Sequence, residues 1–278
     1  MATGDQLADY EEAAVDAAKT AIIELCGLLG AYRTQVALIG GWVPFLLLRP
    51  EADPGQRHPG SLDVDLALDH RTLEGAGYET IGKLLADAGY VRSEEQPFQY
   101  FRVIDGITVR VDLLAGQYGG TGRSRRTQKI QDVQPRKARG CDLVFEIAPV
   151  EVRLEGLLPS GARDAVRVPI ALVVPFLTMK SICMSDRRKS KDPFDIWFVL
   201  SNYPGGIEAV ATAFYPHLQH GLVREALAVL REKFMSIAHI GPKSIAEFDD
   251  GLSTDEKVAR QRDAFERVQA LLRLLAPQ

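Results

Sequence analysis

Three aspartates lie inside otherwise apolar segments, and this pattern restricts the fold more than any other feature of the chain. Asp63 and Asp65 alternate with apolar residues in segment 61–66, and Asp112 lies in the apolar segment 107–114. Residues two apart in a strand point to the same side, so the pattern predicts two strands that each have one apolar side. An unpaired buried carboxylate is costly. Each segment therefore needs a partner for its charge.

A divalent cation would compensate these carboxylates. Asp63 and Asp65 lie side by side on one strand, where like charges raise each other's pKa and a shared metal ion removes the conflict. Asp112 can complete the cluster if its strand is a neighbour of the first. We call the three residues the acid trio and expect them to bind Mg²⁺ or Mn²⁺.

A purely structural explanation of the same residues stays open. Asp63 and Asp65 can discourage aggregation at the edge of a sheet. Asp112 can pair with Arg110 or Arg102. Each carboxylate alone fits this explanation, whereas the combination of the three with the neighbouring glycine turn favours a metal site.

That glycine turn closes the apolar segment 36–39. Gly40 and Gly41 have no Cβ, so their backbone N–H groups can approach a phosphate closely. A nucleoside triphosphate with magnesium satisfies both the turn and the acid trio, and we expect it as the substrate.

The order of these motifs resembles the nucleotidyltransferase superfamily of DNA polymerase beta, whose signature is a strand, a glycine turn, Asp-x-Asp and a third Asp. Within it, segment 61–66 and the later Lys180 with segment 187–196 look like the abortive-infection, AbiEii-like nucleotidyltransferases. These are toxins of toxin–antitoxin systems. The resemblance covers roughly residues 35 to 200. Two departures are a long loop before Asp63 and the bulky Trp42 after the glycine pair.

The resemblance implies an α/β architecture. It predicts a nucleotidyltransferase fold with a mixed, mainly antiparallel sheet and an N-terminal helix at residues 1–173. A helical C-terminal domain at residues 174–278 would close over the nucleotide. The implied activity is metal-dependent transfer of a nucleoside monophosphate from an NTP to an acceptor hydroxyl. The acceptor would be an RNA, such as a tRNA end, or a protein, and a cognate antitoxin would be a partner.

The resemblance also assigns roles to single residues. Asp63, Asp65 and Asp112 would be catalytic and bind the metal. Nucleotide-binding residues would be Gly40, Gly41, Ser61, Lys180, Lys189, Lys191, Asp192 and Asp195.

A purely structural explanation also accounts for two of these residues. Asp192 before Pro193 is typical of a helix N-cap, and Asp195 suits a first helical turn. It does not explain the four basic residues at the same helix start, which a phosphate or an RNA backbone would compensate.

A basic run spans residues 123–139, with seven Lys or Arg against Asp132 alone. It follows the strand that carries Asp112, so we expect it near the rim of the site. An RNA partner and a plain solvated loop are both open at this point.

Two other functions compete with RNA modification. Transfer to a small molecule such as an aminoglycoside predicts an acidic acceptor pocket and no role for the basic run. A non-catalytic nucleotide-binding protein would keep the fold without turnover, and the intact acid trio argues against it.

The composition of the 278 residues is that of an ordinary globular protein, with 46% hydrophobic and 25% charged residues and a net charge of -4. No apolar run reaches membrane-spanning length and no signal pattern opens the chain, so we expect a cytoplasmic protein without a membrane partner. The three cysteines lack metal-ligand spacing.

Several elements follow from local patterns. Asp105-Gly106 predicts an antiparallel hairpin between strands 98–104 and 107–114. Other predicted elements are helices at 5–30 and 73–88, strands at 143–147, 150–154 and 165–171, and a mainly helical region from residue 175 with breaks at 204–206 and 241–242.

Overall fold

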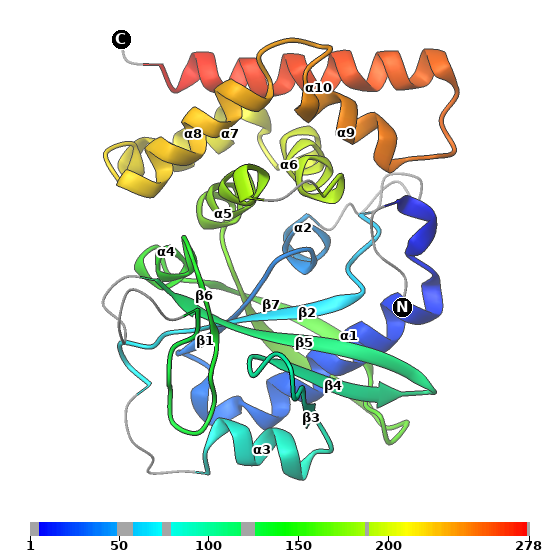
Figure 1. The fold of residues 1–278 in the computed structure, drawn as a ribbon, viewed down its shortest axis with the longest axis vertical. Coiled ribbons are helices and arrows are strands. Elements are labelled where there is room, and N and C mark those ends of the chain that lie inside the picture. The colour runs from blue at the N-terminus through cyan, green and yellow to red at the C-terminus, as the bar shows by residue number, and fades with distance from the viewer. Residues whose placement is uncertain (1–5, 49–57, 74–78, 118–125, 187–188, 277–278) are drawn as a thin grey trace. The chain divides into compact units, whose positions relative to one another are not determined.

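The computed structural model describes residues 6–48, 58–73, 79–117, 126–186 and 189–276 (Figure 1). Helices and one sheet make up these residues, and the region after the last strand is helical. The expected mixture of α and β structure with a helical C-terminal region is therefore confirmed.

The chain divides into two compact units. The sheet unit consists of Glu11–Leu47 and Gly60–Pro175, and the helical unit consists of Met1–Tyr10, Leu48–Pro59 and Phe176–Gln278. The sheet unit ends close to the boundary predicted after residue 173. Two earlier segments also group with the C-terminal helices, and His58 is among their described residues.

In the described residues, a mixed sheet of eight strands forms the centre of the sheet unit. The strands are β1 (Val36–Ile39), β2 (Asp63–Leu68), β3 (Val91–Arg92), β4 (Gln99–Ile104), β5 (Ile107–Gly116), β6 (Arg136–Ala138), β7 (Val150–Leu157) and β8 (Arg163–Ile170). Their order is β3-β4-β5-β2-β1-β8-β7, with β6 paired to β5. In the described sheet, β2 with β5, β1 with β8 and β5 with β6 are parallel, and the other four pairings are antiparallel. The two strands that carry the acid trio are neighbours.

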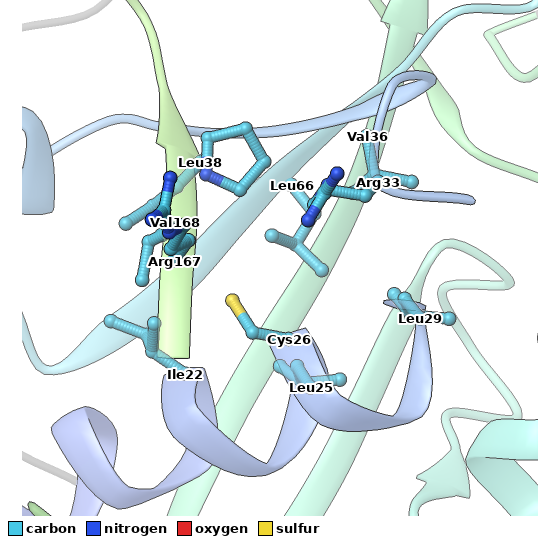
Figure 2. A pocket seen from close by; sticks show the side chains of 11 residues that line it. Ile22, Leu25, Cys26, Leu29, Arg33, Val36, Leu38, Leu66, Arg167 and Val168 are labelled. Carbon is cyan, nitrogen blue, oxygen red and sulfur yellow. The ribbon is translucent and has the colours of Figure 1, made fainter. Parts of the chain in front are cut away.

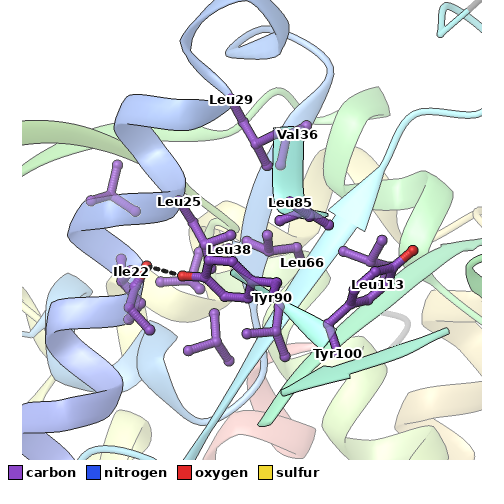
Figure 3. Close-up of a cluster of buried hydrophobic side chains, with 14 of the residues drawn as sticks. Ile22, Leu25, Leu29, Val36, Leu38, Leu66, Leu85, Tyr90, Tyr100 and Leu113 are labelled. Carbon is purple, nitrogen blue, oxygen red and sulfur yellow. Dashed lines mark hydrogen bonds between the residues drawn. The ribbon is translucent and has the colours of Figure 1, made fainter. Parts of the chain in front are cut away.

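One side of the sheet packs on a long helix, α1 (Glu12–Leu28). Its apolar residues recur at helical spacing, and Ile22 and Leu25 are buried against strand residues such as Leu38 and Leu66 (Figure 3). Burying a leucine or isoleucine side chain contributes about 1.5–3 kcal/mol. This core therefore fixes which side of each strand faces inward.

Because side chains alternate along each strand, the acid trio lies on the side of the sheet opposite α1. Val64 and Leu66 lie in the core, so Asp65 between them points away from α1. Asp65 pairs with Ile39 of β1 and with Asp112 of β5, whose side chains share its side. We call this side of the sheet the acid face.

Among its described residues, the sheet unit also contains three shorter α-helices. They are α2 (Trp42–Leu47), α3 (Ile81–Asp87) and α4 (Cys141–Glu146). Figure 1 shows α1 and α3 on one side of the sheet and α2 and α4 on the other. The acid face is therefore the side that also carries the helix after the glycine turn.

The helical unit is built from consecutive helices. They are α5 (Val173–Asp186), which begins in the sheet unit, α6 (Lys191–Asn202), α7 (Gly206–Phe214), α8 (Gly221–Lys233), α9 (Ile240–Phe248) and α10 (Thr254–Leu274). The rings of Phe194 on α6 and Phe248 on α9 lie 4.4 Å apart between centroids. Ser253 and Glu256 form a capping box that starts α10.

The predicted hairpin at Asp105-Gly106 is confirmed. Both residues have positive φ, 50° and 79°, and β4 and β5 pair antiparallel across the turn. This geometry matches the turn that joins two right-twisted strands.

The predicted strand at 143–147 is wrong, because Cys141–Glu146 forms α4. Cys141, Leu143 and Val144 are buried within a single short helix. An apolar run this short is equally compatible with a buried strand, so the sequence could not separate the two. The predicted break at Gly241-Pro242 is also wrong. Both residues lie in the first turn of α9, where proline is tolerated.

Other boundaries shift. The helix expected at 5–30 is α1, preceded by a separate short turn at Leu7–Asp9. The helix expected at 73–88 is confined to α3 among the described residues, and residues 74–78 lie outside them. The short strands β3 and β6 were not predicted. Neither has the alternating apolar pattern of a strand with one buried side.

Candidate functional site

The acid trio comes together on the acid face, as the sequence pattern requires. Asp65 pairs with Asp112 across the parallel β2–β5 ladder, and Asp63 pairs with Arg110. Paired residues of a parallel ladder point to the same side, and so do residues two apart. Asp63 and Asp65 are half-buried, whereas Asp112 is 5% exposed.

Arg110 lies among these carboxylates. Its guanidinium forms an ion pair and hydrogen bond with Asp63 Oδ2, and its Nε lies 3.6 Å from Asp112 Oδ1. Burial alone would lower the pKa of Arg110, but the charges of Asp63, Asp112 and Asp65 outweigh it and raise that pKa. Arg110 therefore compensates part of the negative charge of the acid trio.

The pKa of Asp112 is raised above its ordinary value. Burial raises its pKa, and the charge of Asp63 adds to this shift against the opposing charges of Arg110 and Arg136. Asp112 Oδ1 is buried and has no hydrogen-bond partner among the described residues. A buried polar atom without such a partner is unusual and marks a place where a ligand would gain an interaction.

The side chains of the trio suit a divalent cation chemically. Carboxylate oxygens are the ligands that Mg²⁺ and Mn²⁺ prefer, and one of them has no hydrogen-bond donor among the described residues. In the described part of the chain, however, no three Asp, Glu, His or Cys side chains are arranged so that they could hold a metal ion. The Arg110 guanidinium lies beside two of the three carboxylates instead.

The glycine turn touches the acid trio. Gly40 has a φ of +73°, and a Cβ built on it would overlap the carboxylate of Asp65. Only glycine satisfies both the backbone conformation and this approach. The turn therefore brings backbone close to Asp65, on the face where a phosphate was expected.

Two neighbours hold Asp63 in place. Ser61 Oγ donates a hydrogen bond of 2.8 Å to Asp63 Oδ1, and Trp42 Nε1 donates one of 3.0 Å to the backbone carbonyl of Asp63. Trp42 is fully buried. The bulky residue after the glycine pair therefore packs in the interior and fixes the start of β2.

The predicted residues of the later motif form a second cluster, in the helical unit. Lys180 Nζ lies 2.8 Å from Asp192 Oδ1 and 2.7 Å from Asp195 Oδ2, and Lys191 Nζ lies 2.7 Å from Asp195 Oδ1. His58 joins them, with Nε2 2.8 Å from Asp195 Oδ1. All five side chains are buried. We call these residues the buried ion cluster.

Burial and neighbouring charges shift the pKa values of the buried ion cluster in different directions. Burial alone would lower the pKa of Lys180, but Asp192 and Asp195 raise it, so Lys180 is charged. Burial and the charge of Lys191 lower the pKa of His58 to about 4 against the influence of Asp195. His58 is therefore neutral near pH 7 and can donate Nε2–H to Asp195. Burial and the charge of Lys180 lower the pKa of Lys191 against the charge of Asp195, so Lys180 is the more firmly charged of the two lysines.

The remaining members of the motif lie differently. Lys189 is half-buried, and its backbone carbonyl accepts a hydrogen bond from Asp192 N. Arg187 lies outside the described residues. The predicted N-cap at Asp192 is wrong, because α6 begins at Lys191 after Ser190 and Asp192 lies in its first turn. Lys191 is the first residue of the helix instead, and its buried ammonium group pairs with Asp195.

Sequence patterns did not identify the partner roles of two residues in these clusters. Arg110 was considered only as a partner of Asp112. Its position two residues before Asp112 places it on the same face, and this spacing was the available signal. His58 lies 137 residues from Asp195 in a loop with no periodic pattern, so no local signal pointed to it. Arg102, the other candidate partner of Asp112, pairs instead with Glu24 at 3.1 Å.

Part of the basic run also lies near the acid face. Arg136 on β6 pairs with Leu114, two residues beyond Asp112, and its guanidinium lies 5.2 Å from the ring centroid of Phe98. Arg126 and Lys129 are exposed. Residues 123 and 125 of the run lie outside the described part of the chain.

A pocket opens on the other side of the sheet (Figure 2). It is lined mainly by apolar residues of α1 and of strands β1, β2 and β8, together with Cys26, Arg33 and Arg167. Burial raises the pKa of the Cys26 thiol to about 12, and both arginines pair with Glu151. The pocket is therefore unrelated to the acid trio and contains no activated nucleophile.

Comparison with known proteins adds no relative. No family model, no curated protein and no solved structure matches the chain. Among the helices of the described residues, none has both the length and the apolar character needed to cross a membrane.

Proposed function

We propose that the protein is a metal-dependent nucleotidyltransferase that moves a nucleoside monophosphate from an NTP to an acceptor hydroxyl. The observation that carries the proposal is the acid trio, which lies on one side of two neighbouring parallel strands beside a glycine turn. The motif order resembles the DNA polymerase beta superfamily. A mixed sheet followed by helices is compatible with its nucleotidyltransferase fold.

The residues of the acid face would have different roles in binding the metal and the triphosphate. Asp63 and Asp65 would hold Mg²⁺ or Mn²⁺, which when bound stabilises negative charge on the phosphates. Gly40 and Gly41 would donate backbone N–H groups to phosphate oxygens. Ser61 keeps Asp63 in position through its hydrogen bond. These residues orient the triphosphate.

Asp112 would either bind a second ion or act on the acceptor. In the second role it would orient the acceptor hydroxyl and take its proton while the hydroxyl oxygen forms a bond to the α-phosphorus. The bond from that phosphorus to the bridging oxygen breaks, and pyrophosphate leaves. A raised pKa, as burial gives Asp112, makes a carboxylate a better proton acceptor.

We propose an RNA, such as a tRNA end, as the acceptor. Arg136 lies on the acid face next to the strand of Asp112, and Arg126 and Lys129 of the same run are exposed. Such cations favour a phosphate backbone over a small cationic molecule. The resemblance to AbiEii-like proteins further suggests a toxin that a cognate antitoxin neutralises.

The residues of the later motif keep their proposed role in binding the nucleotide. Lys180 and Lys191 are engaged in ion pairs with Asp192 and Asp195, so a phosphate would have to exchange with a carboxylate to reach either lysine. Lys189 is half-buried and forms no such ion pair with another residue of the described ranges. We therefore expect Lys189 to contribute more directly to nucleotide binding than the two buried lysines.

One observation favours a second candidate, a nucleotide-binding protein without turnover. Arg110 already compensates Asp63 and Asp112, and a permanent ion pair there would exclude a catalytic cation. The two candidates differ in whether the acid trio binds a divalent metal.

Labelling tests the proposed activity. Purified protein is incubated with each α-³²P-labelled NTP, Mg²⁺ and total RNA, and the labelled species is identified on a denaturing gel. We expect label on one RNA class, lost in an Asp65→Asn variant. Absence of label on any RNA, protein or small molecule, or equal labelling by Asp65→Asn, would contradict the proposal.

A further inference from the structure

We infer that Arg110 competes with the divalent cation for the acid trio, so that this side chain sets the metal affinity of the site. The inference rests on the proposed function, because it concerns the cation that the acid trio would bind. It goes beyond that function by assigning a regulatory role to a residue outside the metal ligands.

The first step is the position of the guanidinium. Arg110 belongs to β5, yet it forms an ion pair with Asp63 on β2 and lies 3.6 Å from Asp112 Oδ1 on its own strand. It therefore contacts two of the three carboxylates from which a cation would take its oxygens. The same oxygen atoms cannot serve both partners in full.

The second step is that these contacts are incomplete. Arg110 Nε and Asp112 Oδ1 are both buried, and neither has a hydrogen-bond partner among the described residues. Guanidinium groups bind carboxylates best through two parallel hydrogen bonds. Arg110 satisfies Asp63 but leaves Asp112 without such a bond, so a better partner can displace it.

The third step is exposure. The Arg110 side chain is 35% exposed, and the side chain of Asp63 is 25% exposed. Because this ion pair is only partly buried and lies on the acid face, losing it does not disturb the core on the opposite side. Solvent weakens ion pairs that are partly exposed, so a divalent cation can compete with this one.

The charges set the direction of the effect. The acid trio carries three negative charges, and Arg110 offsets one of them. A cation that binds beside Arg110 must either repel it or displace it. Removing the guanidinium charge while keeping a polar side chain should therefore tighten binding of a divalent metal.

The opposite result has a different physical meaning. If Arg110 instead holds Asp63 and Asp112 in a geometry ready for the metal, its loss would disorder the ligands and weaken binding. The sign of the change in affinity therefore separates a competitor from a positioning residue.

The test measures Mn²⁺ binding to the full chain by isothermal titration, without NTP. The variants are Arg110→Gln, which removes the charge, and Arg110→Lys, which keeps a point charge but loses the guanidinium fork. Arg102→Gln is the matched control, because Arg102 lies on the adjacent strand β4 and pairs with Glu24, away from the trio. Thermal unfolding checks that each variant is folded.

We expect Arg110→Gln to bind Mn²⁺ at least about fivefold more tightly than the parent, the lower end of typical coupling between two ligands. Arg110→Lys should lie between the two, and Arg102→Gln should match the parent. If Arg110→Gln does not fold, tighter binding by Arg110→Lys supports the inference. Equal or weaker binding by the folded Arg110 variants overturns it.

Asp65→Asn distinguishes this inference from the proposed function. If Asp65→Asn abolishes Mn²⁺ binding and Arg110→Gln leaves it unchanged, the metal site stands and only the competition is wrong. If neither the parent nor the Arg110 variants bind Mn²⁺, both proposals fail. Binding by Arg110→Gln but not by the parent would be the strongest support for competition.

Discussion

Each carboxylate of the acid trio has a different environment, although the three share one face of the sheet. Asp63 accepts from Ser61 and pairs with Arg110, Asp65 packs against the backbone of Gly40, and Asp112 is buried with a raised pKa. These environments support different tasks. The half-buried pair suits a cation, and the buried Asp112 suits proton transfer.

Replacing Asp63 should separate activity from stability. Asp63→Asn removes the ion pair with Arg110, and because both partners are partly exposed we expect a loss of about 1 kcal/mol or less in the free energy of unfolding. Nucleotide transfer should fall to background. Urea unfolding and the labelling assay measure the two effects. A variant that keeps normal turnover would remove Asp63 from the site.

The glycine turn offers a sharper test of close packing. Gly40→Ala faces both a φ of +73° and a collision with the Asp65 carboxylate, whereas Gly106→Ala faces a φ of +79° with open space around it. The backbone alone costs roughly 1–2 kcal/mol at either position. We expect Gly40→Ala to lose a further 1–3 kcal/mol or so from overpacking. Equal losses of unfolding free energy in the two variants would show that the Asp65 side chain moves aside without an energetic cost.

The sheet shows what local patterns can and cannot predict. The alternation around Asp63 and Asp65 and the Asp105-Gly106 turn are local, and the strands they predicted are present. The pairing of Asp65 with Asp112 joins residues 47 positions apart. Local patterns do not show which strands are neighbours, so the sequence predicted this pairing only on the condition that the two strands are adjacent. The α4 segment was assigned wrongly because six residues are too few to separate a period of 2 from one of 3.6.

The helices α5 and α6 are joined by the buried ion cluster. Lys180 of α5 contacts Asp192 and Asp195 of α6, and its side chain is 10% exposed. The motif residues were predictable as a group from the family resemblance. Their mutual pairing was not, because the sequence does not say whether a lysine beside an apolar stripe faces water or an aspartate.

Breaking this cluster should be costly. Lys180→Met leaves two buried carboxylates short of a cation, and removal of one partner of a buried pair typically costs about 3–5 kcal/mol. Lys83→Met is the control, because Lys83 pairs with Glu79 and Asp87 on the surface. We expect a much smaller change there. Urea unfolding compares the two, and similar effects would show that the buried ion cluster does not stabilise the fold.

His58 should give the helical unit a dependence on pH. Its pKa is about 4 in the folded protein and 6.5 when unperturbed, so between these values the unfolded chain binds a proton that the folded chain does not. The stabilising contribution is complete above about pH 6.5 and is lost as the pH falls toward 4, by at most about 1.4 kcal/mol per pH unit.

The control for this prediction is His58→Gln, which can still donate to Asp195 but does not titrate. We expect its unfolding free energy to fall less between pH 7 and pH 5 than that of the parent. Identical pH profiles would mean that His58 is not held neutral.

The whole molecule carries a net charge of -4, so any attraction to RNA must come from a local surface. Among the described residues of the basic run, Arg136 lies on the acid face, whereas Arg126 and Lys129 are exposed. A combined Arg126→Ala, Lys129→Ala and Arg136→Ala variant should weaken RNA binding. Each lost phosphate contact should reduce the slope of log affinity against log salt by roughly 0.7 to 0.9.

The same variant should keep its affinity for Mn²⁺ and NTP, because the acid trio and the glycine turn are unchanged. A triple replacement of Arg153, Arg163 and Arg167 is the matched control. These three arginines belong to β7 and β8, on the opposite flank of the sheet from β6. Filter binding at several salt concentrations measures both slopes. If the basic-run variant labels RNA as well as the parent at physiological salt, the cations of this run do not select the acceptor. The run would then be a plain solvated loop, and the RNA would reach the acid face over another surface.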